Sequence, residues 1–515
     1  MRLLSNVHKS TFLPIYLLIQ IHVSNFEIFC LRNQISRIDM NEPSNFCQGC
    51  KCTLPPNEIR NRTFLNPSET PATACALHCL NSCTKDDKFT FPPYMINNSG
   101  RRAPLGEKTV SPSAIHYNDI VHYDAHNLYG IAEAIATNQA LTGSNNTQRP
   151  FVLSRSTFVG SGRWASHWTG DNASTWKDLR WSLVSVLNSN IFGLVHSGAD
   201  ICGFLKDTTE ELCARWIALG ALTYSFARSH CDIHAKPQEP YLWSATTIIA
   251  RKAIRLRLAL VSYLYTLHYL AHTKGAPVIR PTFFEFPKSN YFHSSPDEQA
   301  MLGDKIMVCP VLYEGSVRVN CHLPEGKWYD LHDFAKVKNV SSPNGKTFKF
   351  DVPLTELPPM FILGGSIVPM QLDVGLTVAD TDGTDYTLIV ALDTSGKASG
   401  CLFLDAEDTS LLHSGVMGYF NALIAEKTGS VTFTAEYINE ISDEFVHTNK
   451  FIEKIVILGL PPSKNFLTGE VHPPSQQSSV YIGNAKLKDA DVKRSQQRLE
   501  LRVHINVDLP FKIHW

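Results

Sequence analysis

Three carboxylates stand at the ends of apolar runs in this sequence. Asp39 ends the run "ISRI", Asp171 lies in "GSGRWASHWTGDN", and Asp200 lies in "HSGADICGF". Two carboxylates on either side of a glycosidic bond can hydrolyse it, because one protonates the leaving oxygen while the other attacks the anomeric carbon or activates water. A retaining enzyme holds the two carboxyl groups about 5–5.5 Å apart. The residue types therefore indicate glycoside hydrolysis, and the alternative is that these acids cap loops and form ion pairs.

Other side chains near these acids suit a sugar ligand. Trp164 and Trp168 can stack on the apolar faces of sugar rings, and Arg163 can bind hydroxyl groups through its fork of donors. A fourth polar stretch, "FARSHCD", adds Arg228 and His230. Together these residues predict a site for hydroxylated, flat-faced ligands.

The first half of the chain must position these residues. Strands and helices alternate there, which indicates a parallel sheet with helical crossovers. Polar residues just after the strands of an α/β barrel face one shared mouth. The predicted strands are 35–40, 149–158, the start of 191–204, and 276–286, and the predicted helices are 125–141, 175–190, 209–222 and 244–272.

The pattern of apolar and turn residues changes after about residue 288. Short alternating strands such as "KIMVCPVL" and "YTLIVAL" are separated by Gly, Pro and Asn turns, which is typical of β-sandwiches. The predicted fold class is therefore α/β followed by all-β. The expected domains are a leader (1–36), a barrel (37–287) with a Cys-rich insertion (46–115), a proximal β-sandwich (288–370) and a distal β-sandwich (371–515).

Composition narrows the function classes. The 515 residues are 43% apolar and 18% charged with a net charge of −1, which is globular composition without an electrostatic footprint for nucleic acid. The segment "FLPIYLLIQIHV" resembles the apolar region of a signal peptide and is short for a membrane span, so no stable membrane insertion is expected. The alternative is that residues 1–36 come from a misread gene model.

Cysteines and sequons favour an oxidising compartment. Six of the 13 cysteines fall between positions 47 and 83, where Cys47-x-x-Cys50-x-Cys52 is also close to zinc spacing. Disulfides are favoured over zinc, because the segment has few histidines and is rich in Pro, Asn and Ser. Five sequons agree with secretion to the cell wall, the extracellular space or a vacuole: Asn61, Asn97, Asn145, Asn172 and Asn339.

Four long motifs carry a family resemblance. In order, "IDMNEPSNF", "RSTFVGSGRWASHWTGDN", "GADICGF" and "EELCARWIALGA" closely resemble the signature regions of glycoside hydrolase family 31, the α-glucosidases and α-xylosidases. The resemblance runs from about residue 37 to 290 and continues more weakly through the β-rich tail. The Cys-rich insertion looks most like that of plant members.

The resemblance implies roles for particular residues. Asp39 would be the nucleophile and Asp171 the general acid/base of a double displacement, with no metal or organic cofactor. Cys202 and Cys213 would form a disulfide. The subsite for the non-reducing sugar of an oligosaccharide or polysaccharide substrate would be lined by Met40, Arg163, Trp168, Asp200, Phe204 and His230.

The sequence also departs from the family pattern. Family members have a β-sandwich and three barrel strands before the nucleophile, whereas 38 residues precede Asp39 here, so the resemblance implies an incomplete (β/α)8 barrel. Arg37 stands where the family usually has Trp, and His196 and Ser197 stand where apolar residues are usual. Two functions follow: a retaining α-glucosidase, with α-xylosidase on xyloglucan fragments as the alternative, or an inactive fragment that at most binds carbohydrate. Oligomeric state is left open.

Overall fold

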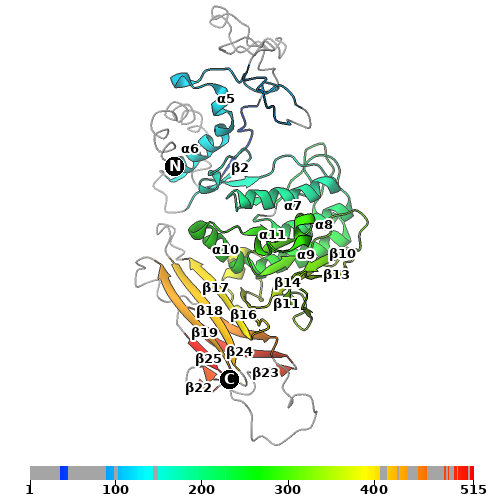
Figure 1. Ribbon diagram of the computed structural model, residues 1–515, viewed down its shortest axis with the longest axis vertical. Coiled ribbons are helices and arrows are strands. Elements are labelled where there is room, and N and C mark those ends of the chain that lie inside the picture. Colours follow the sequence, from blue (N-terminus) through cyan, green and yellow to red (C-terminus); the bar gives the residue numbers. More distant parts are fainter. Residues whose placement is uncertain are drawn as a thin grey trace, which may run out of the picture. The chain divides into compact units, whose positions relative to one another are not determined.

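The chain forms two compact units in a computed structural model, Met1–Trp168 and Thr169–Trp515, and each is described by itself (Figure 1). Most of the predicted leader and all six cysteines between 47 and 83 lie outside the described residues. The described residues are 35–44, 88–97, 102–142, 149–226, 228–405, 415–425, 428–438, 450–460, 481–482, 485–486, 492–495, 497–507 and 511–514.

Three parallel strands organise the first unit. Strand β1 (Ile35–Ile38) pairs with β2 (Phe151–Ser154), and β2 pairs with β3 (Ser166–Trp168). Helix α6 (Tyr129–Thr142) lies between β1 and β2 in the sequence, as a parallel connection requires. Its small residues let it sit close to the strands, and the core between them comprises Ile38, Ala134, Leu141 and Val152. Strand β3 lies in a segment to which the sequence analysis assigned no strand.

Short helical turns surround these strands in the first unit. They are η2 (Tyr117–Asp119), α5 (His122–Ala125) and η3 (His126–Leu128) before α6, and η4 (Ser161–Arg163) before β3. The described part of the predicted insertion 46–115 holds turns and takes part in two isolated bridges, Ser44 with Thr109 and Ile115 with Val121.

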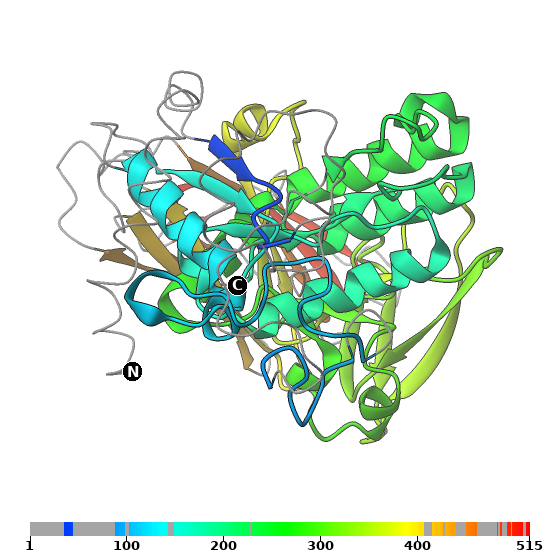
Figure 2. The same ribbon diagram turned by 90° about the horizontal axis from the view of Figure 1, so that it is seen from above.

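Four long helices dominate the start of the second unit: α7 (Trp176–Ile191), α8 (Glu210–Thr223), α9 (Ser244–Ala259) and α10 (Val261–Lys274). Helix α7 begins where Thr175 accepts from the Asp178 N–H, and α8 begins where Thr209 accepts from the Leu212 N–H. Figure 2 shows α7, α8 and α9 side by side. Helix α8 is buried almost all round, which fits its apolar sequence.

Two predicted elements are different in the structure. The predicted helix 244–272 is broken at Leu260, because the Ala259 carbonyl accepts from the Gln371 N–H, a donor from outside the helix. The predicted strand 276–286 is only β7 (Ile279–Pro281), and α11 (Thr282–Glu285) follows it directly. Proline at the end of β7 lacks the N–H that would continue a ladder.

Sheets form the rest of the second unit. Short β4 (Ser197–Gly198), β5 (Asp200–Ile201) and β6 (Arg228–Ser229) come early, and β5 pairs in parallel with β6. A six-stranded sheet follows, in the order β12-β11-β14-β9-β8-β7. Its further strands are β8 (Ala300–Leu302), β9 (Ile306–Val308), β11 (Gly326–Asp330), β12 (Val337–Val340) and β14 (Met360–Leu363), and β10 (Arg318–Leu323) pairs with β13 (Lys346–Asp351). Small helices η5 (Pro240–Leu242), α12 (Asn290–Ser294) and α13 (Val378–Asp382) lie between these elements in the sequence.

The C-terminal strands join in one eleven-stranded sheet, in the order β22-β21-β25-β19-β18-β17-β15-β16-β20-β24-β23. Strand β15 (Ser366–Met370) already belongs to this sheet, although the predicted boundary lies after it; the domain boundaries stay predictions. The other strands are β16 (Tyr386–Ala391), β17 (Lys397–Asp405), β18 (Gly415–Ala425), β19 (Thr428–Ile438), β20 (Phe451–Leu458), β21 (Tyr481–Ile482), β22 (Ala485–Lys486), β23 (Val492–Ser495), β24 (Arg498–Asn506) and β25 (Phe511–His514).

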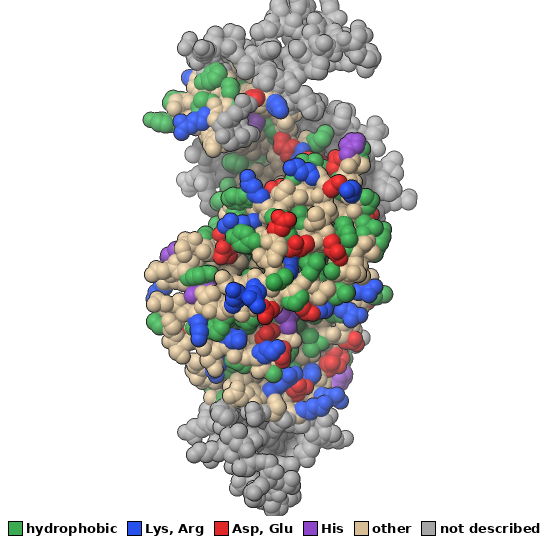
Figure 3. All heavy atoms as spheres, turned by 90° about the vertical axis from the view of Figure 1, so that its right-hand side faces the viewer, with side chains coloured by type: hydrophobic (Ala, Val, Ile, Leu, Met, Phe, Trp, Pro, Cys, Tyr) green, Lys and Arg blue, Asp and Glu red, His purple; other side chains and the backbone are tan. Residues whose placement is uncertain are grey.

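The face in Figure 3 carries basic and acidic side chains interspersed over the described residues. Among those residues, no helix is long and apolar enough to cross a membrane. The α/β elements followed by β-sheets confirm the predicted fold class.

Candidate active site

The candidate nucleophile follows β1 directly. Because side chains alternate along a strand, Arg37 and Asp39 lie on one side while Ile38 enters the core. The Arg37 Nη2 donates to Asp39 Oδ2 at 2.5 Å, and the Arg155 Nη1 lies 3.0 Å from Asp39 Oδ1. The Met40 N–H also donates to Oδ1, at 2.9 Å. Two cations and a backbone donor therefore fix the carboxylate, whose side chain remains 35% exposed.

The two residues after Met40 anchor this turn. The buried Asn41 side chain donates to Ser154 Oγ at 2.9 Å and accepts from the Ser156 N–H at 2.9 Å. Glu42 accepts from the Arg155 Nε and Nη2 at 2.8 and 2.9 Å. This two-pronged hydrogen bond lowers the pKa of Glu42. The polar cluster after "ISRI" is thus the clamp that joins the ends of β1 and β2.

The other predicted site residues of the first unit have different surroundings. Arg163 ends η4, is exposed, and lies over the Trp164 ring at 5.0 Å. Trp168 is 1% exposed, and the Arg37 guanidinium lies 4.6 Å from its ring centroid. Met40 has a left-handed backbone (φ 54°) and is 78% exposed, so it is available to a ligand.

The candidate acid/base lies at the tip of a tight turn in the second unit. The Asn172 N–H donates to the Gly170 carbonyl at 3.0 Å, which places the exposed Asp171 at the apex. We call residues 170–172 the Asp171 turn. Gly170 has φ 79°, a conformation that glycine adopts without strain.

A second loop, residues 200–206, carries the predicted subsite residues Asp200 and Phe204, and we call it the subsite loop; His230 follows β6. Asp200 is 1% exposed and pairs with Arg228, whose Nε donates at 2.8 Å and whose Nη2 lies 2.7 Å away. The Phe204 ring stacks on His230, with centroids 4.9 Å apart. The loop therefore carries a buried carboxylate paired with Arg228 and an aromatic ring stacked on His230.

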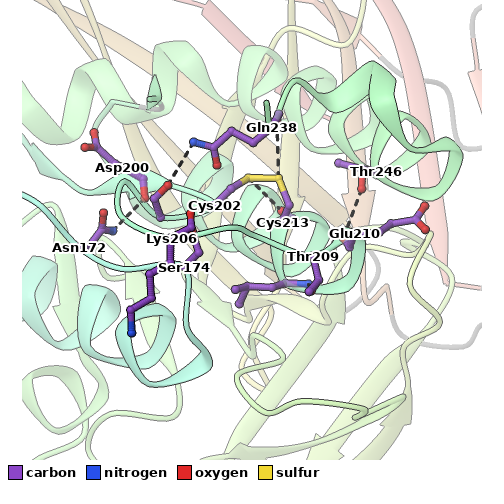
Figure 4. Close-up of a disulfide and its surroundings, with 12 residues drawn as sticks. Asn172, Ser174, Asp200, Cys202, Lys206, Thr209, Glu210, Cys213, Gln238 and Thr246 are labelled. Atoms are coloured by element: carbon purple, nitrogen blue, oxygen red, sulfur yellow. Dashed lines mark hydrogen bonds between the residues drawn. A yellow bond between two sulfur atoms is a disulfide. The ribbon is translucent and has the colours of Figure 1, made fainter. Parts of the chain in front are cut away.

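A disulfide holds the back of the subsite loop (Figure 4). Cys202 and Cys213 form the bond that the family resemblance implied, and it ties the loop to the buried helix α8. The Gln238 side chain donates to the Gly203 carbonyl at 3.1 Å. Gly203 has φ 90°, and a Cβ there would come within 2.4 Å of the Ser174 N, so only glycine fits.

Sequence reasoning missed several residues that the structure makes important. Arg155 was quoted within a motif and given no role, although its spacing after a strand is the same signal that identified Asp39. Asn172 was read as a sequon, but its amide is bonded inside the fold. Cys309 and Cys321 form a second disulfide for which the sequence held no pairing signal. The other two described sequons, Asn97 and Asn339, are exposed.

Two half-buried histidines lie side by side outside the subsite loop. His196, which replaces an expected apolar residue, stacks on Phe226 and lies beside His268. Burial, reinforced by His268 and Arg257, lowers the pKa of His196 to about 4. Within the described parts of the chain, no group of three or more His, Cys, Asp or Glu side chains could hold a metal ion.

Comparisons with known proteins identify the family of this chain. Residues 22–267 match the model of the glycosyl hydrolases family 31 TIM-barrel domain, and residues 275–368 match that of the family 31 C-terminal domain. The chain belongs to glycoside hydrolase family 31. This family 31 chain therefore carries the barrel-type and C-terminal domains in the expected order.

The relatives that this family 31 chain resembles include proteins named as an alpha-xylosidase and an alpha-glucosidase. It is 39% identical to "Alpha-xylosidase 1" of Arabidopsis thaliana over 93% of its own length and 52% of the relative's. It is 43% identical to the "Alpha-glucosidase" of Mucor javanicus over 72% of its length and 43% of the relative's. A glucosidase II alpha subunit structure matches with a TM-score of 0.67 and 28% identity, over 80% of this chain and 45% of the other. The chain spans about half the length of the curated relatives it matches.

The candidate residues thus fall into two sets. Asp39, Met40, Arg163 and Trp168 lie in the first unit, and Asp171, Asp200, Phe204 and His230 lie in the second. In the second set, Asp171 lies on the Asp171 turn, Asp200 and Phe204 lie on the subsite loop, and His230 follows β6 and stacks on Phe204. Chemically, the first set offers a held carboxylate, and the second offers an exposed acid beside a polar and aromatic surface.

Proposed function

We propose that this chain carries the catalytic machinery of a retaining α-glycosidase that releases terminal α-linked glucose from oligosaccharides. The observation that carries the proposal is the second set of residues. An exposed carboxyl at the apex of the Asp171 turn lies beside the subsite loop, in which the buried Asp200 pairs with Arg228 and Phe204 stacks on His230. Proton donors for leaving oxygens and flat binding surfaces are the two parts that a sugar hydrolase needs.

The proposed mechanism is double displacement. Asp39 attacks the anomeric carbon while Asp171 protonates the leaving oxygen, giving a β-linked glycosyl-enzyme. Asp171 then takes a proton from water, and the resulting attack releases the sugar with its original configuration. Trp168, Arg163 and Met40 complete the sugar subsite in this proposal.

The substrate has a second candidate. The relative that aligns over 93% of the chain is named an alpha-xylosidase, whereas the alpha-glucosidase of Mucor javanicus aligns over 72%. Xylose lacks only the hydroxymethyl group of glucose, and a pocket discriminates such a group by about 1–3 kcal/mol. Activity on both α-glucosides and α-xylosides is therefore expected, with glucose preferred.

A competing function is carbohydrate binding without hydrolysis. The observation in its favour is the Arg37–Asp39 pair, since a carboxylate held by two guanidinium groups is a weaker nucleophile. In either case the partner is an oligosaccharide or polysaccharide. Two disulfides agree with the secretory pathway as its location.

The deciding experiment measures release from 4-nitrophenyl α-glucoside and α-xyloside. Asp39→Asn and Asp171→Asn should each lower kcat/KM by about 10²–10⁴-fold, the contribution typical of such groups. Asp351→Asn, an exposed carboxylate in β13, is the matched control and should leave the rate unchanged. Proton NMR of the first-formed sugar should show the α-anomer. A folded chain that binds glucose and releases nothing would favour the binding function instead.

A further inference from the structure

Asn172 joins the Asp171 turn to the subsite loop through both of its amide groups. Its side-chain Nδ2 donates to the Asp200 carbonyl at 2.9 Å (Figure 4). Its Oδ1 accepts from the Phe204 N–H at 3.2 Å. Its backbone carbonyl accepts from the Phe204 and Leu205 N–H groups, at 2.9 Å each. One residue therefore links the turn to the loop at both ends of the segment that carries Asp200 and Phe204.

The chemistry of these contacts selects asparagine. A carboxamide offers one donor side and one acceptor side on a short stem. Aspartate would place a second oxygen opposite the Asp200 carbonyl, where the structure needs a donor. Alanine would remove the side-chain hydrogen bond of both groups and leave each with one backbone partner, the Gly203 N–H for the Asp200 carbonyl and the Asn172 carbonyl for the Phe204 N–H. Each lost hydrogen bond typically costs about 0.5–1.5 kcal/mol.

The same residue also shapes the turn beside it. Because the Asn172 N–H closes onto the Gly170 carbonyl, Asp171 is held between that hydrogen bond and the side-chain contacts of Asn172. A movement of the Asn172 side chain would therefore move the carboxyl of Asp171 relative to Asp200. The disulfide and Gln238 hold the opposite side of the subsite loop and do not contact the Asp171 turn in this way.

We propose that Asn172 is a positioning residue that sets Asp171 at a fixed distance from the Asp200 and Phe204 side of the sugar subsite. The inference rests on the proposed function for the roles of Asp171 and Asp200, and it adds the residue that couples them. It also gives the sequon at Asn172 a different role: the nitrogen to which a glycan would attach is already bonded to Asp200.

The test compares three single variants. Asn172→Ala removes both side-chain hydrogen bonds, and Asn172→Asp removes only the donor. Ser174→Ala is the matched control, because it destroys the same sequon, lies in the same pair of loops and keeps the Asn172 amide. The Ser174 side chain donates one hydrogen bond, from its hydroxyl to the Lys206 carbonyl at 3.1 Å, and the backbone bond from its N–H to the Leu205 carbonyl is kept in the variant.

Two readouts separate positioning from simple destabilisation. Hydrogen exchange of the peptide spanning 203–206 should become about tenfold faster in Asn172→Ala, the change expected when about 1.4 kcal/mol of hydrogen bonding is lost. On 4-nitrophenyl α-glucoside, kcat/KM should fall by about 10²-fold, as for a displacement of about 1 Å, with kcat lowered and KM raised. A purely structural role would reduce the folded fraction and leave the KM of that fraction unchanged.

The outcomes are distinct. Faster exchange in both Asn172 variants but not in Ser174→Ala, with a changed KM, supports the inference. Unchanged exchange and an unchanged KM in folded Asn172→Ala overturn it. If the parent protein is folded but hydrolyses nothing, the proposed function fails, and the exchange measurement together with the affinity for glucose decides the inference alone.

Discussion

The Arg37–Asp39 pair predicts that this chain restrains its own candidate nucleophile. During the first chemical step the Asp39 carboxylate becomes an ester and loses its negative charge, so any cation that stabilises the carboxylate stabilises the starting state more than the transition state. Replacing Arg37 by leucine removes one of the two cations and leaves Arg155 in place. The variant is therefore expected to react faster than the parent.

The contacts set the size of this effect. The Arg37 Nη2 lies 2.5 Å from Asp39 Oδ2, and the two side chains are 39% and 35% exposed. A hydrogen bond to a charged group contributes about 1.5–3 kcal/mol, but solvent reduces an exposed pair to about 0–1 kcal/mol. A half-exposed pair lies between, at about 1 kcal/mol, which corresponds to a roughly fivefold change in rate.

The assay is kcat/KM on 4-nitrophenyl α-glucoside, since this ratio reports the first irreversible step. Arg37→Leu should raise it about fivefold, and Arg37→Trp should act similarly. Arg318→Leu is the control. Arg318 forms an exposed ion pair with Asp351 in the β-rich region, so this substitution removes the same charge far along the chain from Asp39. A folded Arg37→Leu protein with an equal or lower kcat/KM would refute the reasoning and show that the cation assists the reaction.

Three further predictions concern stability, measured by urea unfolding. Arg228→Met leaves the buried Asp200 carboxylate without its cation and should cost about 3–5 kcal/mol, much of which the double variant with Asp200→Leu should recover. The pKa of His196 is about 4 in the folded protein and 6.5 in the unfolded chain. The stability that the neutral imidazole contributes is therefore fully present above pH 6.5 and is lost as the pH falls toward 4. At pH 5 the loss is about 2 kcal/mol, and His196→Leu should remove that much of the difference between pH 7.5 and 5; an unchanged difference contradicts the assignment. Replacing both Cys202 and Cys213 by alanine removes a disulfide that spans 11 residues and should lower the free energy of unfolding by about 3 kcal/mol. If a reductant destabilises the parent and the double Ala variant equally, this disulfide does not contribute that stability.

Local signals predicted the helices that the site depends on. Thr175 and Thr209 each precede acids and an apolar repeat, and α7 and α8 begin directly after them. These starts could be read from sequence because the caps are made by residues three positions away. The alternation of strands and helices, followed by β-rich texture, predicted the fold class for the same reason.

Contacts between distant residues could not be read in this way. The break at Leu260 depends on a donor from Gln371, more than a hundred positions later. Arg155 clamps Asp39 and Glu42, and Cys309 pairs with Cys321, only because the fold brings them together. The sequence identified the residue types at the candidate site, while their partners were a property of packing.

The backbone of the subsite loop offers a physical reason for its many restraints. Cys202 and Lys206 have left-handed φ values of 74° and 68°, at a cost of roughly 1–2 kcal/mol for each non-glycine residue. Such conformations persist only where the surroundings over-determine them, and they gather at functional sites. Here the disulfide and Gln238 act from one side and Asn172 from the other. A loop held on both sides presents Asp200 and Phe204 in one arrangement before a sugar arrives, so less binding energy is lost in ordering it. We therefore propose that the strained loop and the Asn172 link act together, since releasing the link would let the loop relax away from the shape proposed to bind sugar.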